Sequence, residues 1–250
     1  MGEMKVGCQL IIFGREAIAN DLPGVLETLG DAGYAGAETG DLSGQISASE
    51  LKQLLTSLGL ELVGTHVGFD ALHTEVDRLA DYLVEAGGNY LVSSGVGDRS
   101  KGLAVYEEAA PVMNEAGRKL GERGLTFCYH NHSWEFEKFD GQPALLRLYE
   151  LTDPEVVKLC VDTYWVHHGG EDAADFVARY ARRVAILHLK DMKDETFAEV
   201  GEGVLDFAGI LKAVEGQAVE WAVVEQDRTQ RTPEESVRMS RRYLRDWLGV

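Results

Sequence analysis

The chain has 250 residues, of which 45% are hydrophobic, and its formal net charge is -18. This length and composition suit one large α/β domain that spans residues 1–250. The negative charge argues against nucleic acid and anionic membrane surfaces as partners, and no apolar run is long enough to cross a membrane.

The cysteines and the N-terminus indicate the cellular compartment. Cys8, Cys128 and Cys160 lie far apart within apolar segments. An odd number of cysteines in such places predicts reduced, buried thiols and no disulfide framework. The first residues, MGEMKVG, lack the basic and apolar pattern of a secretory signal. We therefore expect a cytoplasmic protein. These features do not decide whether the protein forms a homo-oligomer.

Apolar runs that suit strands alternate with helical patterns along the whole chain. The predicted strands cover residues 5–13, 34–38, 60–66, 90–94, a run from 125 to the histidines at 130 and 132, 156–162, 184–189 and 221–225. The predicted helices cover residues 22–33, 48–58, 72–86, 106–123, 143–149, 173–182, 207–214 and a last segment from 232 to about 247. Eight such repeats predict a single (β/α)8 TIM barrel with a parallel sheet. A doubly wound open sheet fits less well, because the first turn, FGREAI, has no glycine fingerprint.

Polar side chains follow the predicted strands, at the end where TIM barrels carry their chemistry. In chain order these are Glu38, His66, His130 with His132 and Glu135, Asp162, His188 with Lys190, and Glu225 with Asp227. Asp162, His188 and Glu225 each lie at the end of a hydrophobic strand, and buried charges of this kind need a partner. Either they pair with one another or cap helices, or they share a divalent cation, for which the mixed oxygen and nitrogen ligands suit Mn²⁺, Mg²⁺, Co²⁺ or Zn²⁺.

The strand-end motifs resemble a known family. GYAGAE, GTHVG, YHNHSWEF, CVDTYW, ILHLKD, GEGVLDF and VVEQD occur in this order over nearly the whole chain. The combination is similar to the xylose-isomerase-like TIM-barrel superfamily, in particular its sugar phosphate isomerase/epimerase members. The resemblance implies that Asp162, His188 and Glu225 are metal ligands of one divalent ion.

The fifth strand departs from the epimerase pattern. In the ketose epimerases a glutamate at the end of this strand is both a metal ligand and a base, whereas this chain has His130 there. Either Glu135 reaches back to the metal and leaves His130 as a base, or His130 is itself the ligand. We prefer the first alternative, because it keeps three carboxylates on the ion.

The resemblance implies removal of a proton from a carbon next to a carbonyl, with the ion stabilising the resulting charge. We predict a metal-dependent sugar isomerase or epimerase that acts on a ketose, keto-sugar or cyclitol. The predicted catalytic residues are His130, His132 and Glu225, of which a histidine is the preferred base. The residues expected to bind the substrate are Glu38, His66, Lys190, Trp134 and Trp165.

Three alternatives compete with this prediction. The same intermediate can expel a leaving group, which would make the protein a dehydratase or lyase that acts on a keto-sugar or an inosose. A barrel that binds sugar without turnover would need no base on the fifth strand. Metal-dependent phosphodiester cleavage fits poorly, because a net charge of -18 disfavours a surface that binds nucleic acid.

Overall fold

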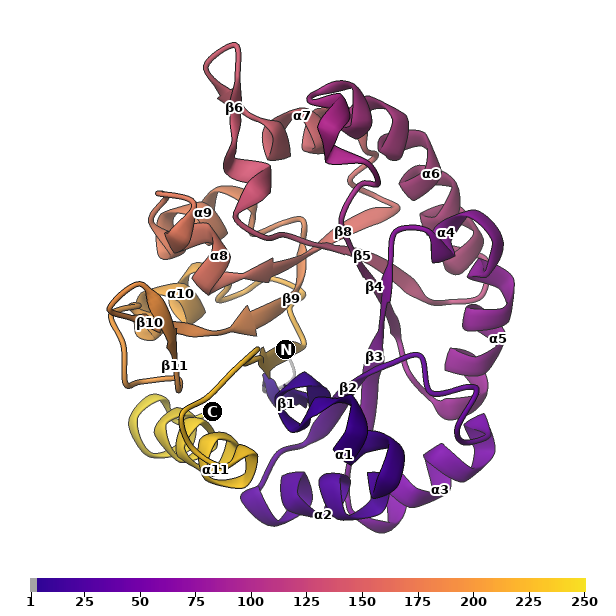
Figure 1. Cartoon of the computed structure of the whole chain (residues 1–250), viewed down its shortest axis with the longest axis vertical. Helices are drawn as coiled ribbons and strands as arrows, with labels where there is room; N and C mark the ends of the chain where they lie inside the picture. Colours follow the sequence, from indigo (N-terminus) through magenta and orange to yellow (C-terminus); the bar gives the residue numbers. More distant parts are fainter. Residues whose placement is uncertain (1–3) are drawn as a thin grey trace.

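The computed structural model describes residues 4–250; residues 1–3, which the predicted domain and the N-terminal motif include, lie outside the described residues. Eight parallel strands form a closed barrel in the order β1-β12-β9-β8-β5-β4-β3-β2, and helices surround it (Figure 1). The predicted TIM barrel is therefore confirmed. The barrel strands are β1 (Lys5–Gln9), β2 (Gly36–Gly40), β3 (Glu61–Gly68), β4 (Tyr90–Ser94), β5 (Thr126–His130), β8 (Val157–Asp162), β9 (Val184–Leu189) and β12 (Trp221–Val224).

The helices lie outside the barrel and follow its strands. They are α1 (Gly14–Asn20), α2 (Leu22–Ala32), α3 (Ala48–Ser57), α4 (Ala71–Thr74), α5 (Val76–Ala86), α6 (Ala104–Gly121), α7 (Ala144–Leu151), α8 (Thr163–His168), α9 (Ala173–Tyr180), α10 (Phe207–Ala213) and α11 (Pro233–Tyr243). The short 3-10 turns are η1 (Leu10–Phe13), η2 (Arg99–Lys101) and η3 (Trp134–Phe136), and a π-helical turn, η4 (Leu244–Leu248), follows α11. None of the described helices combines the length and apolar character that a membrane span requires.

Two small hairpins extend the loops at the carboxyl-terminal end of the barrel. β6 (Lys138–Phe139) pairs with β7 (Gln142–Pro143), and β10 (Asp191–Lys193) pairs with β11 (Thr196–Ala198). The sequence patterns did not predict these hairpins or the short helices α1 and α8. Segments of this length contain too few residues to show a helical or alternating period.

Three of the predicted elements differ most clearly from the structure. The first strand ends at Gln9 instead of residue 13, because the Gln9 side chain accepts a hydrogen bond from the backbone N–H of Ile11 at 2.5 Å and the chain turns into η1. The predicted helix over residues 72–86 is divided at Glu75, where α4 ends and α5 follows. β5 ends at His130, so His132 lies in the loop that follows and is not part of the strand.

The core has two layers. One lies between the strands and the helices, and a smaller cluster fills the barrel interior around Trp221, Val63 and Ile186. Gly36 makes room for this interior ring, since a Cβ there would lie 2.8 Å from the indole of Trp221. The three cysteines are buried and free, as predicted. This packing forms the floor on which the polar strand ends lie.

Candidate metal centre and pocket

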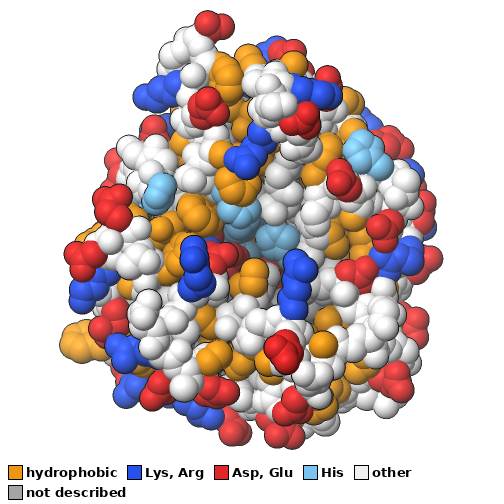
Figure 2. Space-filling model, viewed as in Figure 1, with side chains coloured by type: hydrophobic (Ala, Val, Ile, Leu, Met, Phe, Trp, Pro, Cys, Tyr) orange, Lys and Arg blue, Asp and Glu red, His pale blue; other side chains and the backbone are white. Residues whose placement is uncertain are grey.

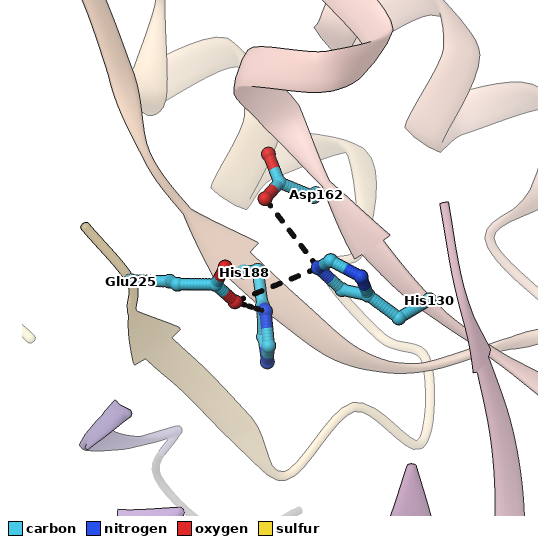
Figure 3. A group of neighbouring side chains, drawn as sticks. All are labelled: His130, Asp162, His188 and Glu225. Atoms are coloured by element: carbon cyan, nitrogen blue, oxygen red, sulfur yellow. Dashed lines mark ion pairs between the residues drawn. The ribbon is translucent and has the colours of Figure 1, made fainter. Parts of the chain in front are cut away.

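Four polar side chains meet at the carboxyl-terminal end of the barrel (Figure 3). His130 ends β5, Asp162 ends β8, His188 lies near the end of β9, and Glu225 directly follows β12. One potential ligand atom of each residue lies within 4.8 Å of the others, and all four residues are buried. The four strands are neighbours in the closed sheet, so the fold itself gathers the cluster.

The two distances from His130 to the carboxylates of the cluster fit a bound cation. Nε2 of His130 lies 3.4 Å from Oδ2 of Asp162 and 3.5 Å from Oε2 of Glu225. Nitrogen and oxygen ligands about 2.0–2.2 Å from one tetrahedral cation lie about 3.4 Å from each other. His188 contacts Glu225 through Nδ1, as an ion pair that lacks hydrogen-bond geometry.

The hydrogen bonding of the cluster supports the same conclusion. Nε2 of His130, Nδ1 of His188 and Oε2 of Glu225 are buried and find no hydrogen-bond partner among residues 4–250. Buried polar atoms are nearly always paired with protein, water or an ion. Three such atoms directed at one another, with the Asp162 carboxylate beside them, fit a divalent ion such as zinc or manganese.

Lys190 adds a positive charge beside the cluster. Its ammonium group is fully buried and lies 3.3 Å from Oδ2 of Asp162 and 3.1 Å from Oε1 of Glu225, and it also contacts Asp227. Burial alone would lower the pKa of Lys190, but the attraction of Asp162 and Glu225 outweighs burial and raises it. The lysine therefore stays charged and offsets part of the repulsion between these two carboxylates.

Glu135 does not belong to the cluster. Its buried carboxylate accepts hydrogen bonds from the hydroxyl of Tyr129 at 2.5 Å and from the backbone N–H of His132 at 2.9 Å. Burial raises the pKa of Glu135 above its usual range. Of the two alternatives for the fifth strand, the geometry favours His130 as the ligand, and Glu135 instead fixes the loop that carries His132.

Glu38 and His66 lie next to each other on β2 and β3. Oε2 of Glu38 lies 3.0 Å from Nε2 of His188, and Oε1 lies 3.3 Å from Nδ1 of His66. Burial would raise the pKa of Glu38, but the attraction and hydrogen bonds of His188 and His66 lower it to about 2. The predicted contact of Glu38 with a substrate therefore lacks support, because both of its oxygens are engaged below the pocket.

A pocket of about 310 Å³ opens above the cluster. Its lining includes His66, His130, His132 and Glu225 together with Gln9 and Ser94. Histidine side chains form the bottom of the hollow in Figure 2, and hydrophobic and cationic groups surround it. The pocket lies where a TIM barrel binds its substrate.

His132 lies at one side of this pocket. Its ring centroid is 4.8 Å from that of His130, and it stacks on Trp134 at 4.0 Å with an interplanar angle of 12°. The ring of Trp165 lies 5.5 Å away. Burial and the neighbouring charge of His130 lower the pKa of His132, because both disfavour the protonated imidazole. Both predicted tryptophans thus border the imidazole of His132 at the side of the pocket.

The sequence patterns missed residues that hold the site together. Asn131 donates a hydrogen bond to the carbonyl of Asp162 at 3.3 Å and accepts one from its backbone N–H at 3.1 Å, which ties the end of β5 to the end of β8. The hydroxyl of Ser94 lies 3.2 Å from Nε2 of His66. The position of both residues at strand ends was the available signal. Uncharged side chains at such positions indicate a functional site less clearly than charged ones do.

Comparison with known proteins places the chain in a family. The family model of the xylose isomerase-like TIM barrel matches residues 26–247, and the chain belongs to this family, as its motifs predicted. It is 26% identical to the inosose dehydratase of Geobacillus kaustophilus, with 91% of this chain and 90% of that protein covered. It is 25% identical to the inosose dehydratase of Clostridium perfringens, with 86% of each chain covered.

Solved structures share the fold. A sugar phosphate isomerase/epimerase from Parabacteroides distasonis has a TM-score of 0.84 at 24% identity and covers 98% of this chain and 95% of its own. The IolI protein, which was solved with a zinc atom, has a TM-score of 0.77 at 15% identity and covers 97% of both chains.

Proposed function

We propose that this protein is a divalent-metal-dependent dehydratase that removes water from a keto-cyclitol or a keto-sugar. The observation that carries the proposal is the cluster of His130, Asp162, His188 and Glu225 directly below a pocket that His132 lines. The likeness to inosose dehydratases over most of the chain supports the class of substrate.

The four clustered side chains would hold the ion. A divalent cation in this place supplies a Lewis acid that polarises a substrate carbonyl and stabilises the negative charge on its oxygen. The ammonium group of Lys190 lies 3.3 Å from Asp162 and 3.1 Å from Glu225 and balances part of their negative charge. Glu38 contacts Nε2 of His188, the ring nitrogen that does not face Glu225, and so holds the ring in place. The protein therefore provides both the ligands and the charge balance that such an ion requires.

His132 is the proposed base. Trp134 fixes its ring by stacking, and Glu135 fixes its backbone through a hydrogen bond of 2.9 Å. The imidazole removes a proton from the carbon next to the carbonyl. The C–O bond at the following carbon then breaks, and the protonated imidazole gives its proton to the departing hydroxide. The products are an unsaturated ketone and water, so one histidine serves first as the base and then as the acid.

This arrangement favours elimination over epimerisation. Inversion of a carbon by two bases needs one base on each of its faces. Glu225 is occupied by Lys190 and the two histidines of the cluster, and His66 has its ring nitrogens near Glu38 and Ser94. Elimination requires only His132.

A sugar isomerase or epimerase is the second candidate. His66 lines the same pocket, and its ring centroid is 5.0 Å from that of His130. It could serve as a second base if its contact with Ser94 opened when a substrate bound, since such hydrogen bonds often rearrange in the complex.

An incubation in D₂O separates the candidates. The protein is stripped with a chelator, reloaded with Mn²⁺, Co²⁺ or Zn²⁺, and mixed with inososes and with ketoses. We expect a product that has lost one water, formed only after metal is restored. Recovery of an isomer that carries solvent deuterium without loss of water would favour the isomerase or epimerase. Binding without turnover of any of these compounds would contradict both enzymes and favour a sugar-binding barrel.

A further inference from the structure

Glu38 is a buried carboxylate that joins two histidines across the barrel. It lies in the middle of β2, its side chain is fully shielded from solvent, and it contacts His66 on β3 and His188 on β9. β2 and β9 are not neighbours in the sheet, so this contact spans the barrel interior. The burial of an ionised carboxylate at this place, away from water and without a partner, would cost free energy.

The contact with His188 determines which of its nitrogens can bind a cation. A carboxylate only accepts hydrogen bonds, so Nε2 of His188, at 3.0 Å from Oε2 of Glu38, carries the proton in a neutral imidazole. The lone pair then lies on Nδ1. This is the nitrogen that faces Glu225 and has no hydrogen-bond partner within residues 4–250.

The contact with His66 follows the same rule. Nδ1 of His66 lies 3.3 Å from Oε1 of Glu38 and therefore donates, which leaves Nε2 to accept the hydroxyl hydrogen of Ser94 at 3.2 Å. Every hydrogen bond from Ser94 through His66 to Glu38 then has one direction. Both histidines depend on one group that accepts at both of its oxygens.

We propose that Glu38 is a positioning residue that fixes the tautomers of His188 and His66 and so presents Nδ1 of His188 to the divalent ion. The inference rests on the proposed metal-dependent function. This positioning role takes the place of the role in substrate binding that the sequence predicted for Glu38. Carboxylates that hold the second nitrogen of a ligand histidine typically change metal affinity by about 10- to 100-fold when they are removed.

The isosteric change Glu38→Gln tests this role. A glutamine side chain has one accepting oxygen and one donating NH₂ group, so it cannot accept from both histidines. If the NH₂ group faces His188, the proton of that ring must move to Nδ1, where it blocks the cation. We expect the affinity of chelator-stripped E38Q for Zn²⁺ to fall by about 10- to 100-fold in a calorimetric titration.

The matched control is Glu199→Gln. Glu199 is also a buried glutamate with a hydrogen bond to a side chain, that of Thr229 at 2.6 Å, but it lies outside the cluster. Circular dichroism and thermal unfolding check that both variants fold. We expect E199Q to bind Zn²⁺ as the unaltered protein does. Equal Zn²⁺ affinity of E38Q and the unaltered protein would overturn the inference and leave the proposed function standing.

A second measurement does not depend on the folding of a variant. Nitrogen-15 NMR of the zinc-loaded, unaltered protein reports which nitrogen of His188 carries the proton. We expect a protonated Nε2 and a metal-bound Nδ1. A metal-bound Nε2 would overturn the role of Glu38 alone, whereas failure of the unaltered protein to bind Zn²⁺ or any other divalent ion would overturn both the role and the proposed function.

Discussion

The two halves of the barrel contribute differently to the site. The adjacent strands β5, β8, β9 and β12 deliver the four ligand-type side chains, two of them carboxylates. The strands β1 to β4, drawn from indigo to purple in Figure 1, deliver Gln9, His66 and Ser94 to the pocket wall. Their buried glutamate, Glu38, faces His188 and not the pocket.

This difference has an electrostatic reason. Two buried carboxylates that lie close together repel each other unless a cation stands between them. The second half of the barrel, from β5 to β12, therefore needs an ion or Lys190 to be stable in its ionised form. The first half, from β1 to β4, does not need such a cation, and its side chains can give the pocket wall its shape and orient the substrate. Changes in the second half should consequently affect activity far more than changes in the first.

The largest effect is expected for Asp162→Asn. The amide keeps an oxygen that can accept from the backbone N–H of Trp165, as Oδ1 of Asp162 does at 3.1 Å, but it removes the charge that faces His130 and Lys190. We expect kcat/KM to fall by about 10,000-fold, which corresponds to about 5 kcal/mol of transition-state stabilisation. Steady-state kinetics and a metal titration measure the loss.

The control for this change is Asp172→Asn. Asp172 caps α9 in the same way, through a hydrogen bond of 2.9 Å to the backbone N–H of Asp175, and it lies on the exposed surface. Its variant should keep full activity. A metal-binding, active D162N would show that the second half of the barrel does not hold the ion as proposed.

His132→Phe should separate proton transfer from metal binding. Phenylalanine preserves the stacking on Trp134 but accepts no proton. We expect kcat to fall by about 1,000-fold, within the range of a lost general base, while the affinity for the metal stays the same. His73→Phe, on the exposed face of α4, is the matched control and should be silent. Undiminished turnover by H132F would remove His132 from the reaction.

Asn131→Ala tests how the strands of the second half are held in place. The change leaves the buried backbone groups of Asp162 without their partners and should lower the free energy of unfolding by about 1–3 kcal/mol. Because Asp162 is a proposed ligand, the metal affinity should also fall, by about 10-fold. Urea unfolding and calorimetry measure the two effects.

Asn114→Ala provides the comparison. The Asn114 side chain bridges the backbone in the same manner, with 3.1 Å to the carbonyl of Leu151 and 2.7 Å to the N–H of Asp153, and it does not line the pocket. It should lose stability and keep the metal affinity. Equal metal affinities for N131A and N114A would mean that Asn131 stabilises the fold without positioning Asp162.

Most of the fold could be predicted from the sequence, because strong periodic patterns mark long elements. The strand over residues 184–189 was predicted with the bounds of β9. The strand ends also indicated where Asp162, His188 and Glu225 would meet. These positions follow from the topology alone, since the carboxyl ends of parallel strands gather at one rim.

The details of the fifth strand could not be predicted in this way. The choice between His130 and Glu135 depends on a turn of the chain after His130, and the sequence did not indicate that Glu135 would bond to Tyr129 and to the backbone of His132. The burial of Glu38 against His188 likewise depends on contacts between strands that are distant in the sequence. Local patterns report the period of an element but not its partners across the barrel.

The smallest effect is expected for Ser94→Ala in the first half of the barrel. The change removes the hydroxyl that lies 3.2 Å from Nε2 of His66 and leaves Glu38 in place to hold the ring. A neutral hydrogen bond of this kind contributes about 0.5–1.5 kcal/mol, so kcat/KM should fall by only about threefold. Ser93→Ala is the control, because the Ser93 hydroxyl is buried without a partner among residues 4–250 and should not matter for turnover. If S94A lost as much activity as H132F, the wall of the first half would take part in the chemistry itself, and the contrast between the two halves would fail.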